Sequence, residues 1–266
     1  MPRARSGDFD YERDGGSYDA VRRADPSIAA RIASALGPAR TVLNVGAGAG
    51  SYEPEARRVV AVEPSAAMRA RRPPGVGPVV DAVAERLPFA PASFDAALAV
   101  LTVHHWRDRS AGLQEMRRIA RGPVVVLTFD PEALERYWLA HYAPELMEVE
   151  RRRYPPLDAI DAALGGGAAV WEVPIPRTCT DGFTEAFFGR PEAFLDPRIR
   201  RAQSAWGFLE AGVEERCVAR LRHDLESGTW DERYGSCRRQ DDFAGAVRLV
   251  VHQPPRTSGA VVTVQQ

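Results

Sequence analysis

The first 130 residues alternate between short apolar runs and segments of helical character. Five runs are typical of buried strands: residues 41–45, 59–63, 77–82, 94–100 and 123–129. Helical segments, among them residues 65–72 and 109–121, lie between the runs. Continuous apolar strands that alternate with helices indicate a parallel sheet whose two faces are both covered. The sequence therefore predicts a doubly wound α/β fold.

After residue 130 the alternation gives way to longer helical stretches. Residues 168–175 and 245–253 read as a sixth and a seventh strand, and helices are expected over 18–36, 131–146 and 156–164. A helical insert, about residues 177–243, separates the last two strands, and so long a connection in a compact domain is usually functional. We expect a single domain over residues 18–266 that includes this insert as a cap, and a disordered tail over residues 1–17.

Charge and cysteine content exclude several classes of protein. The 35 basic and 36 acidic residues give a net charge of −1, which argues against a nucleic-acid-binding surface. No apolar run is long enough for a membrane span or a signal peptide. The three cysteines form no CxxC pair, so neither a metal site nor a disulfide framework is expected. We expect a cytoplasmic monomer or homodimer without nucleic-acid or membrane partners.

Three glycines follow the first strand and precede an expected helix: Gly46, Gly48 and Gly50. Glycine permits a sharp turn and lets a ligand approach the backbone closely. Glu63 ends the second strand, where a carboxylate can accept both hydroxyls of a ribose. The combination predicts a nucleoside-binding crevice at the carboxyl ends of the strands.

The spacing of the loop discriminates between two classes of nucleoside ligand. Dinucleotide-binding enzymes carry GxGxxG, but the position of the third glycine holds Ser51. The observed GxGxG spacing suits an adenosyl-sulfonium ligand better. A nicotinamide-dependent oxidoreductase remains the alternative, as does a tight turn that binds nothing.

At this point the chain resembles the class I S-adenosylmethionine-dependent methyltransferases of the bacterial small-molecule type. VLNVGAGAGSY resembles the first motif of that family and VVAVEPSAAM the second. AERLPFAPASFDAALAVLTVHHW resembles the third and fourth motifs, and LQEMRRIARGPVVVLTF the helix and strand that follow. The resemblance covers about residues 18–130. It implies a Rossmann-like, seven-stranded, mostly parallel sheet with an antiparallel last strand, and S-adenosyl-L-methionine as cofactor.

Carried over position by position, the resemblance implies a set of cofactor-binding residues: Tyr18, Arg22, Asn44, Gly46, Gly48, Gly50, Glu63, Pro64, Val83, Ala84, Glu85 and Leu101. Two positions depart from the family's pattern. Asn44 stands where the first motif usually has an acidic residue, so it keeps an acceptor oxygen but lacks the charge that suits the cofactor's ammonium. Val83 stands where the third motif often has aspartate.

Candidates for catalysis and for acceptor binding come from three regions. His104 and His105 follow the fourth strand, and an imidazole suits proton removal at neutral pH, although lining the pocket or ordering the loop would also explain them. A set of aromatic residues could line an apolar acceptor pocket or pack in a core: Trp138, Tyr142, Phe183, Phe187 and Phe188. We expect methyl transfer to an oxygen or nitrogen of a small, partly apolar molecule. A protein that binds the cofactor without catalysis is the other alternative.

Overall fold

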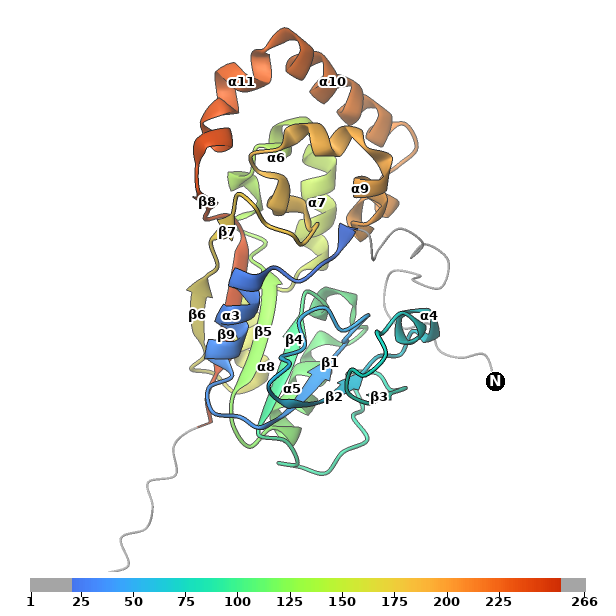
Figure 1. Ribbon diagram of the computed structural model, residues 1–266, viewed down its shortest axis with the longest axis vertical. Helices are drawn as coiled ribbons and strands as arrows, with labels where there is room; N and C mark the ends of the chain where they lie inside the picture. Colours follow the sequence, from blue (N-terminus) through green and yellow to red (C-terminus); the bar gives the residue numbers. More distant parts are fainter. Residues whose placement is uncertain (1–20, 255–266) are drawn as a thin grey trace, which may run out of the picture.

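The computed structural model describes residues 21–254, which form a seven-stranded sheet with a helical lobe at the carboxyl ends of its strands (Figure 1). The strand order is β3-β2-β1-β4-β5-β9-β6. Strands β1 to β5 are parallel, and β9 lies antiparallel between β5 and β6. This confirms the expected fold class and the antiparallel last strand. The strands are β1 (Thr41–Val45), β2 (Arg58–Val62), β3 (Val79–Val80), β4 (Ala96–Val100), β5 (Val124–Phe129), β6 (Ala169–Glu172) and β9 (Val247–His252).

Helices cover both faces of the sheet. Helix α3 (Pro26–Ala35) packs on one face, and α5 (Arg109–Ile119) and α8 (Leu157–Leu164) pack on the other (Figure 1). Neighbouring residues of a strand point to opposite faces, so Val42 belongs to the core cluster under α3 and Leu43 to the cluster under α5 and α8. The central strands therefore need apolar residues at every position, which is why they read as continuous runs rather than as alternating patterns.

Helix α3 is only the C-terminal part of the helix predicted over residues 18–36, because residues 22–25 are not helical. It begins at Pro26, and Asp25 caps it by accepting the backbone N–H groups of Ser27 and Ile28. Proline disfavours the helical conformation in the residue before it, and Asp25 is extended. Arg22 instead forms a β-bridge with Asp181 of the insert. Residues 1–20, and with them the tail expected over 1–17, lie outside the described residues, as do 255–266.

Two separate segments build the helical lobe. One follows β5 and contains η3 (Leu134–Arg136), α6 (Leu139–Tyr142) and α7 (Pro144–Arg153), so the helix expected over 131–146 is broken at Pro144. The other is the expected insert between β6 and β9. Its elements are η4 (Thr184–Phe187), η5 (Pro191–Leu195), α9 (Pro197–Arg201), η6 (Ser204–Phe208), α10 (Val213–Ser227), α11 (Thr229–Tyr234) and η7 (Gly235–Arg239).

The expected sixth strand is split. Strand β6 ends at Glu172, and β7 (Ile175–Pro176) pairs with β8 (Asp242–Phe243) in a separate two-stranded sheet. Pro174 and Pro176 have no N–H to donate, so the pairing with β9 cannot continue past them. The split lets the chain leave the main sheet and enter the lobe.

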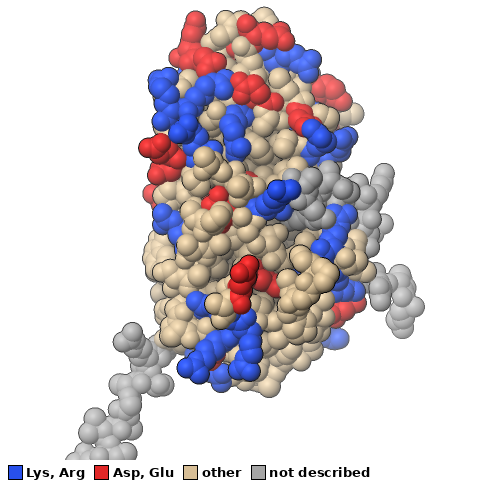
Figure 2. Space-filling view, in the orientation of Figure 1, with Lys and Arg blue, Asp and Glu red and all other residues tan. Residues whose placement is uncertain are grey.

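The outer surface carries charges of both signs. On the face shown in Figure 2, acidic and basic side chains are interspersed over the helical lobe, and neither sign forms a continuous field. Within residues 21–254, no helix is both long and apolar enough to cross a membrane.

Glu185 joins the lobe to the main sheet. It is 1% exposed, and its carboxylate accepts the backbone N–H of Ala246 at 2.9 Å, next to the start of β9. Burial raises the pKa of Glu185 to about 7, and Arg248 opposes the rise only in part. The native protein therefore holds this carboxyl protonated at pH values where the unfolded chain ionises it.

We expect Glu185→Gln to stabilise the protein at about pH 8 and to change little at about pH 4. Below the ordinary carboxyl pKa the native and unfolded states are both protonated, and above it the stability of the wild type falls until the native carboxyl also ionises at about pH 7. The shift corresponds to at most about 3 kcal/mol. Thermal unfolding of both proteins at the two pH values measures it, with Glu55→Gln on the exposed loop as control. An equal effect at both pH values would contradict the assignment.

Candidate active site

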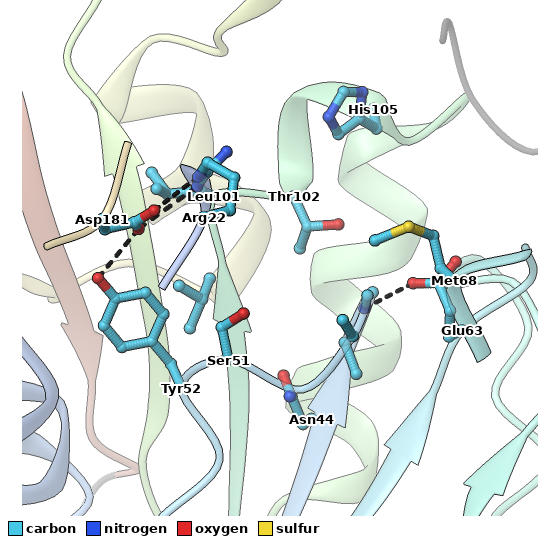
Figure 3. Close-up of a pocket in the computed structure, with 15 residues that line it drawn as sticks. Arg22, Asn44, Ser51, Tyr52, Glu63, Met68, Leu101, Thr102, His105 and Asp181 are labelled. Atoms are coloured by element: carbon cyan, nitrogen blue, oxygen red, sulfur yellow. Dashed lines mark hydrogen bonds and ion pairs between the residues drawn. The ribbon is translucent and has the colours of Figure 1, made fainter. Parts of the chain in front are cut away.

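A cleft opens at the carboxyl ends of β1, β2 and β4, beneath the helical lobe (Figure 3). It contains about 640 Å³ of empty space, part of which is open solvent. Its lining residues are Arg22, Asn44, Gly46, Ala47, Gly48, Ala49, Ser51, Tyr52, Glu63, Met68, Val100, Leu101, Thr102, His105 and Asp181.

The glycine loop forms the floor of this cleft. Gly46 and Gly48 have φ angles of +69° and +53°, which side chains rarely adopt. A Cβ at Gly46 would lie 2.2 Å from Thr102 Oγ1, and one at Gly48 would lie 3.3 Å from Met68 Cε. The loop is fixed because Val62 of β2 accepts the backbone N–H of Gly46 at 2.8 Å. Glycine is therefore required here both for the turn and for the space above it.

Glu63 connects the loop to the turn after β2. Its carboxylate accepts the backbone N–H of Gly48 at 2.8 Å and that of Ser65 at 2.9 Å. Burial raises the pKa of Glu63, and the two backbone hydrogen bonds partly offset the rise. Each carboxylate oxygen has a second lone pair. The side chain can accept the two hydroxyls of a ribose without releasing the loop.

Asn44 supplies an acceptor at the bottom of the cleft. It is 2% exposed, its Nδ2 donates to Glu53 Oε1 at 3.2 Å, and its Oδ1 has no hydrogen-bond partner among residues 21–254. A buried acceptor without a partner is costly, so a ligand that brings a donor to this point is favoured. The glycine floor, the Glu63 carboxylate and this oxygen together fit an adenosyl amino acid.

Three segments that are distant in the sequence meet at Asp181. Its Oδ1 accepts from Arg22 Nε at 2.6 Å, and its Oδ2 accepts from Tyr52 Oη at 3.0 Å (Figure 3). Asp181 is 2% exposed and belongs to the insert, whereas Tyr52 directly follows the glycine loop. Sequence reasoning identified Arg22 but missed Tyr52, and it considered Asp181 only as a polar neighbour of the phenylalanines expected around the acceptor. No local motif marks either residue, because only the fold brings them together.

The two histidines have different surroundings. His105, in η2 (Val103–His105), lines the cleft, and its Nδ1 lies 3.3 Å from Arg153 Nη2. His104 is 5% exposed and packs against the rings of His105 and Tyr154, with centroids 3.9 and 4.3 Å away. Burial lowers the pKa of His104 well below its usual value, so this ring is neutral. Of the two predicted candidates, only His105 is placed to meet a ligand in the cleft.

The other expected cofactor residues lie around the cleft rather than in its lining: Gly50, Pro64, Val83, Ala84 and Glu85. Gly50 has a φ angle of +90° and lies against Arg72. A Cβ at this position would be only 2.9 Å from Arg72 Nη1. Ala84 is buried in the core, and Glu85 accepts the backbone N–H of Asp108 at 3.1 Å. Leu101 lines the cleft in a strained conformation, at φ +48°. Tyr18 lies outside the described residues.

The aromatic residues expected around the acceptor form the core of the lobe. Trp138 donates through Nε1 to the carbonyl oxygen of Phe188 at 2.8 Å, and Phe183 packs edge-on against Phe129. Trp138, Tyr142, Phe183, Phe187 and Phe188 are all buried in one cluster, apart from the lining of the cleft as the described residues define it. Of the two alternatives that the sequence left open, a pocket lining and a core, these residues occupy the core.

Comparisons with known proteins agree with this geometry. Residues 43–127 match the profile of a methyltransferase domain. A protein from Anabaena variabilis, assigned as a methyltransferase of an antibiotic biosynthesis pathway, is 29% identical, with 86% of this chain and 98% of that chain covered and a TM-score of 0.79. A Galdieria sulphuraria protein, assigned as a sarcosine dimethylglycine methyltransferase, shares the fold at 14% identity, with coverages of 85% and 83% and a TM-score of 0.50. No curated protein sequence matches the chain.

The matched segment, residues 43–127, contains the glycine loop, Glu63 and the strand that leads to His105, and the Anabaena protein shares the fold over nearly its whole length. The chain thus carries a methyltransferase domain in residues 43–127 and resembles the S-adenosyl-L-methionine-dependent methyltransferases in fold.

Proposed function

We propose that this enzyme transfers a methyl group to an oxygen or nitrogen of a small, partly apolar molecule. The observation that carries the proposal is the position of Asp181, since the insert reaches the rim of the cleft there and limits the size of an acceptor. The net charge of −1 also favours a small acceptor over a polyanion. The Anabaena relative, assigned to antibiotic biosynthesis, supports the same class of acceptor.

The residues of the cleft divide into a cofactor side and an acceptor side. When bound, S-adenosyl-L-methionine supplies an electrophilic methyl group, so that the protein has to place and orient the two reactants. We assign the ribose hydroxyls to Glu63 and the amino-acid part to the region of Asn44 and Arg22, which line the same cleft. Thr102 and His105 then remain at the end of β4 for the acceptor.

The contact with Arg153 determines what His105 can do. A guanidinium only donates hydrogen bonds, so Nδ1 of His105 accepts, and the neutral ring carries its proton on Nε2. In this state Nε2 can donate to an acceptor atom but cannot remove a proton from it. We therefore assign His105 to orienting the acceptor, and the general-base role that the sequence suggested requires the contact with Arg153 to break.

Glu63→Gln is expected to weaken binding of S-adenosylhomocysteine about tenfold, because it removes one of two charged acceptors for the ribose. Binding of 5′-methylthioadenosine, which has the same ribose, should weaken equally. Titration calorimetry measures both, with Glu55→Gln as the control and NADH as a ligand that should not bind. If the wild type binds neither adenosine compound, the cleft is not the cofactor site.

For the acceptor, we expect mass spectrometry to detect methylated products from a panel of small phenols, alcohols and amines, but not from tRNA or protein. With such an acceptor, His105→Gln keeps a donor and should retain most activity, whereas His105→Phe should lose up to about tenfold in kcat/KM. A general base would lose about a hundredfold or more in both variants. Transfer only to macromolecules, or only to carbon, would contradict the proposal.

A further inference from the structure

A buried carboxylate lies directly behind the residue that forms the bottom of the cleft. Glu53 follows the glycine loop, and its Oε1 accepts both from Asn44 Nδ2 at 3.2 Å and from Arg72 Nη1 at 2.8 Å. Its Oε2 accepts from Arg72 Nη2, also at 2.8 Å. The side chains of Glu53 and Arg72 are 7% and 4% exposed. The result is a bidentate ion pair, shielded from solvent, with one amide attached to it.

This arrangement determines which way the Asn44 amide points. A carboxylate only accepts hydrogen bonds, so the group that faces Glu53 must be the amide nitrogen. The oxygen is then directed away from Glu53, where it is buried and has no partner among the described residues. Asn44 lines the cleft (Figure 3), so the group that remains unsatisfied is an acceptor next to the ligand.

We propose that Glu53, held by Arg72, is a positioning residue that fixes Asn44 with its oxygen toward the ammonium group of the cofactor, so that this site requires an amide rather than a carboxylate at residue 44. The inference rests on the cofactor assignment above. The carboxylate of Glu53 lies behind Asn44, further from the ligand, and is already paired with Arg72. The ammonium is recognised by hydrogen bonding to a neutral oxygen.

The proposal has a consequence opposite to that of simple charge matching. A carboxylate facing an ammonium would by itself bind more tightly than an amide. Here, however, Asn44→Asp would place a second carboxylate about 3 Å from Glu53 Oε1, in the position of the donor that it replaces. The two like charges would repel each other, and the pair would have only Arg72 to neutralise it. The substitution should therefore weaken binding of the cofactor.

The protonation state of the introduced group provides a specific test. When protonated, an aspartic acid has the shape of asparagine and can donate to Glu53 while its carbonyl oxygen faces the ligand. Burial and the neighbouring carboxylate favour that form, so the loss of affinity should diminish as pH falls. Other titratable or charged groups line the same cleft and require the wild type to be measured at each pH: Arg22, Tyr52, Glu63, His105 and Asp181.

The experiment is titration calorimetry with S-adenosylhomocysteine and with 5′-methylthioadenosine, which shares the adenosine but lacks the amino acid. At about pH 7.5, Asn44→Asp should weaken S-adenosylhomocysteine about tenfold or more relative to wild type, and at about pH 6 by less than about threefold. Binding of 5′-methylthioadenosine should stay within about twofold. Glu55→Gln, on an exposed carboxylate of the same loop, should change neither ligand.

The double variant Asn44→Asp/Glu53→Gln exchanges the amide and the carboxylate and removes the repulsion. It should bind S-adenosylhomocysteine more tightly than Asn44→Asp alone. The changes in binding free energy of the two single variants should therefore not add up to that of the double variant. Glu53→Gln leaves Arg72 buried without its ion pair, which can destabilise the fold. Thermal unfolding is therefore measured for each variant that is titrated. The pH comparison on Asn44→Asp does not depend on the double variant.

Each outcome decides one question. Equal or tighter binding by Asn44→Asp at about pH 7.5, or a loss that does not depend on pH, would overturn the positioning role of Glu53. A parallel loss of both ligands would mean that the substitution disturbs the whole site, and it would also overturn the proposal. If the wild type itself binds neither ligand, it is the cofactor assignment that fails.

Discussion

The active-site cleft depends on the cost of burying carboxylates. Glu53, Glu63 and Asp181 are largely withdrawn from water, and a buried carboxylate is tolerated only when donors satisfy it. The backbone of the sheet cannot supply those donors because its groups are paired within the strands, and among the side chains of the central strands only Asn44 donates to one of the three. They come instead from the glycine loop, the turn after β2, the segment before α3 and an arginine that follows α4 (Ala66–Ala70). Satisfying these charges brings the loops together at one edge of the sheet.

This constraint also couples the lobe to the cofactor side. Asp181 is the insert's contribution to the cleft, and its two partners, Arg22 and Tyr52, come from opposite ends of the α3–β1 region. Asp25, which caps α3, donates its backbone N–H to the same Tyr52 hydroxyl at 3.2 Å. A change in the position of the insert would leave the buried Tyr52 and the half-buried Arg22 without their shared acceptor. The cleft and its cover thus behave as one hydrogen-bonded unit, although no helix or strand is common to them.

Much of the fold was readable from the sequence, because the central strands are buried on both faces and their apolar runs are unbroken. The glycine spacing and Glu63 were readable for a related reason, since both belong to a single strand–loop–strand segment. The split of the sixth strand was not predicted, although Pro174 and Pro176 carried the signal. The roles of Tyr52, Glu53 and Asp181 were missed because they depend on partners 9 to 159 residues away in the sequence. The shorter first helix shows the same limit, since Arg22 is held by the insert.

The acceptor side differs from the cofactor side in its physical construction, and this explains why its chemistry is harder to read. The cofactor side consists of strand ends and loops fixed by the sheet, so residue spacing translates into geometry. The lobe is built from two segments joined through an aromatic core, in which Trp138 and Phe188 serve packing. A sequence does not show whether a large aromatic residue lines a pocket or fills a core, because burial of its apolar surface is favourable in both environments. What distinguishes the region that we assign to the acceptor is instead a small number of polar contacts, above all the one between His105 and Arg153.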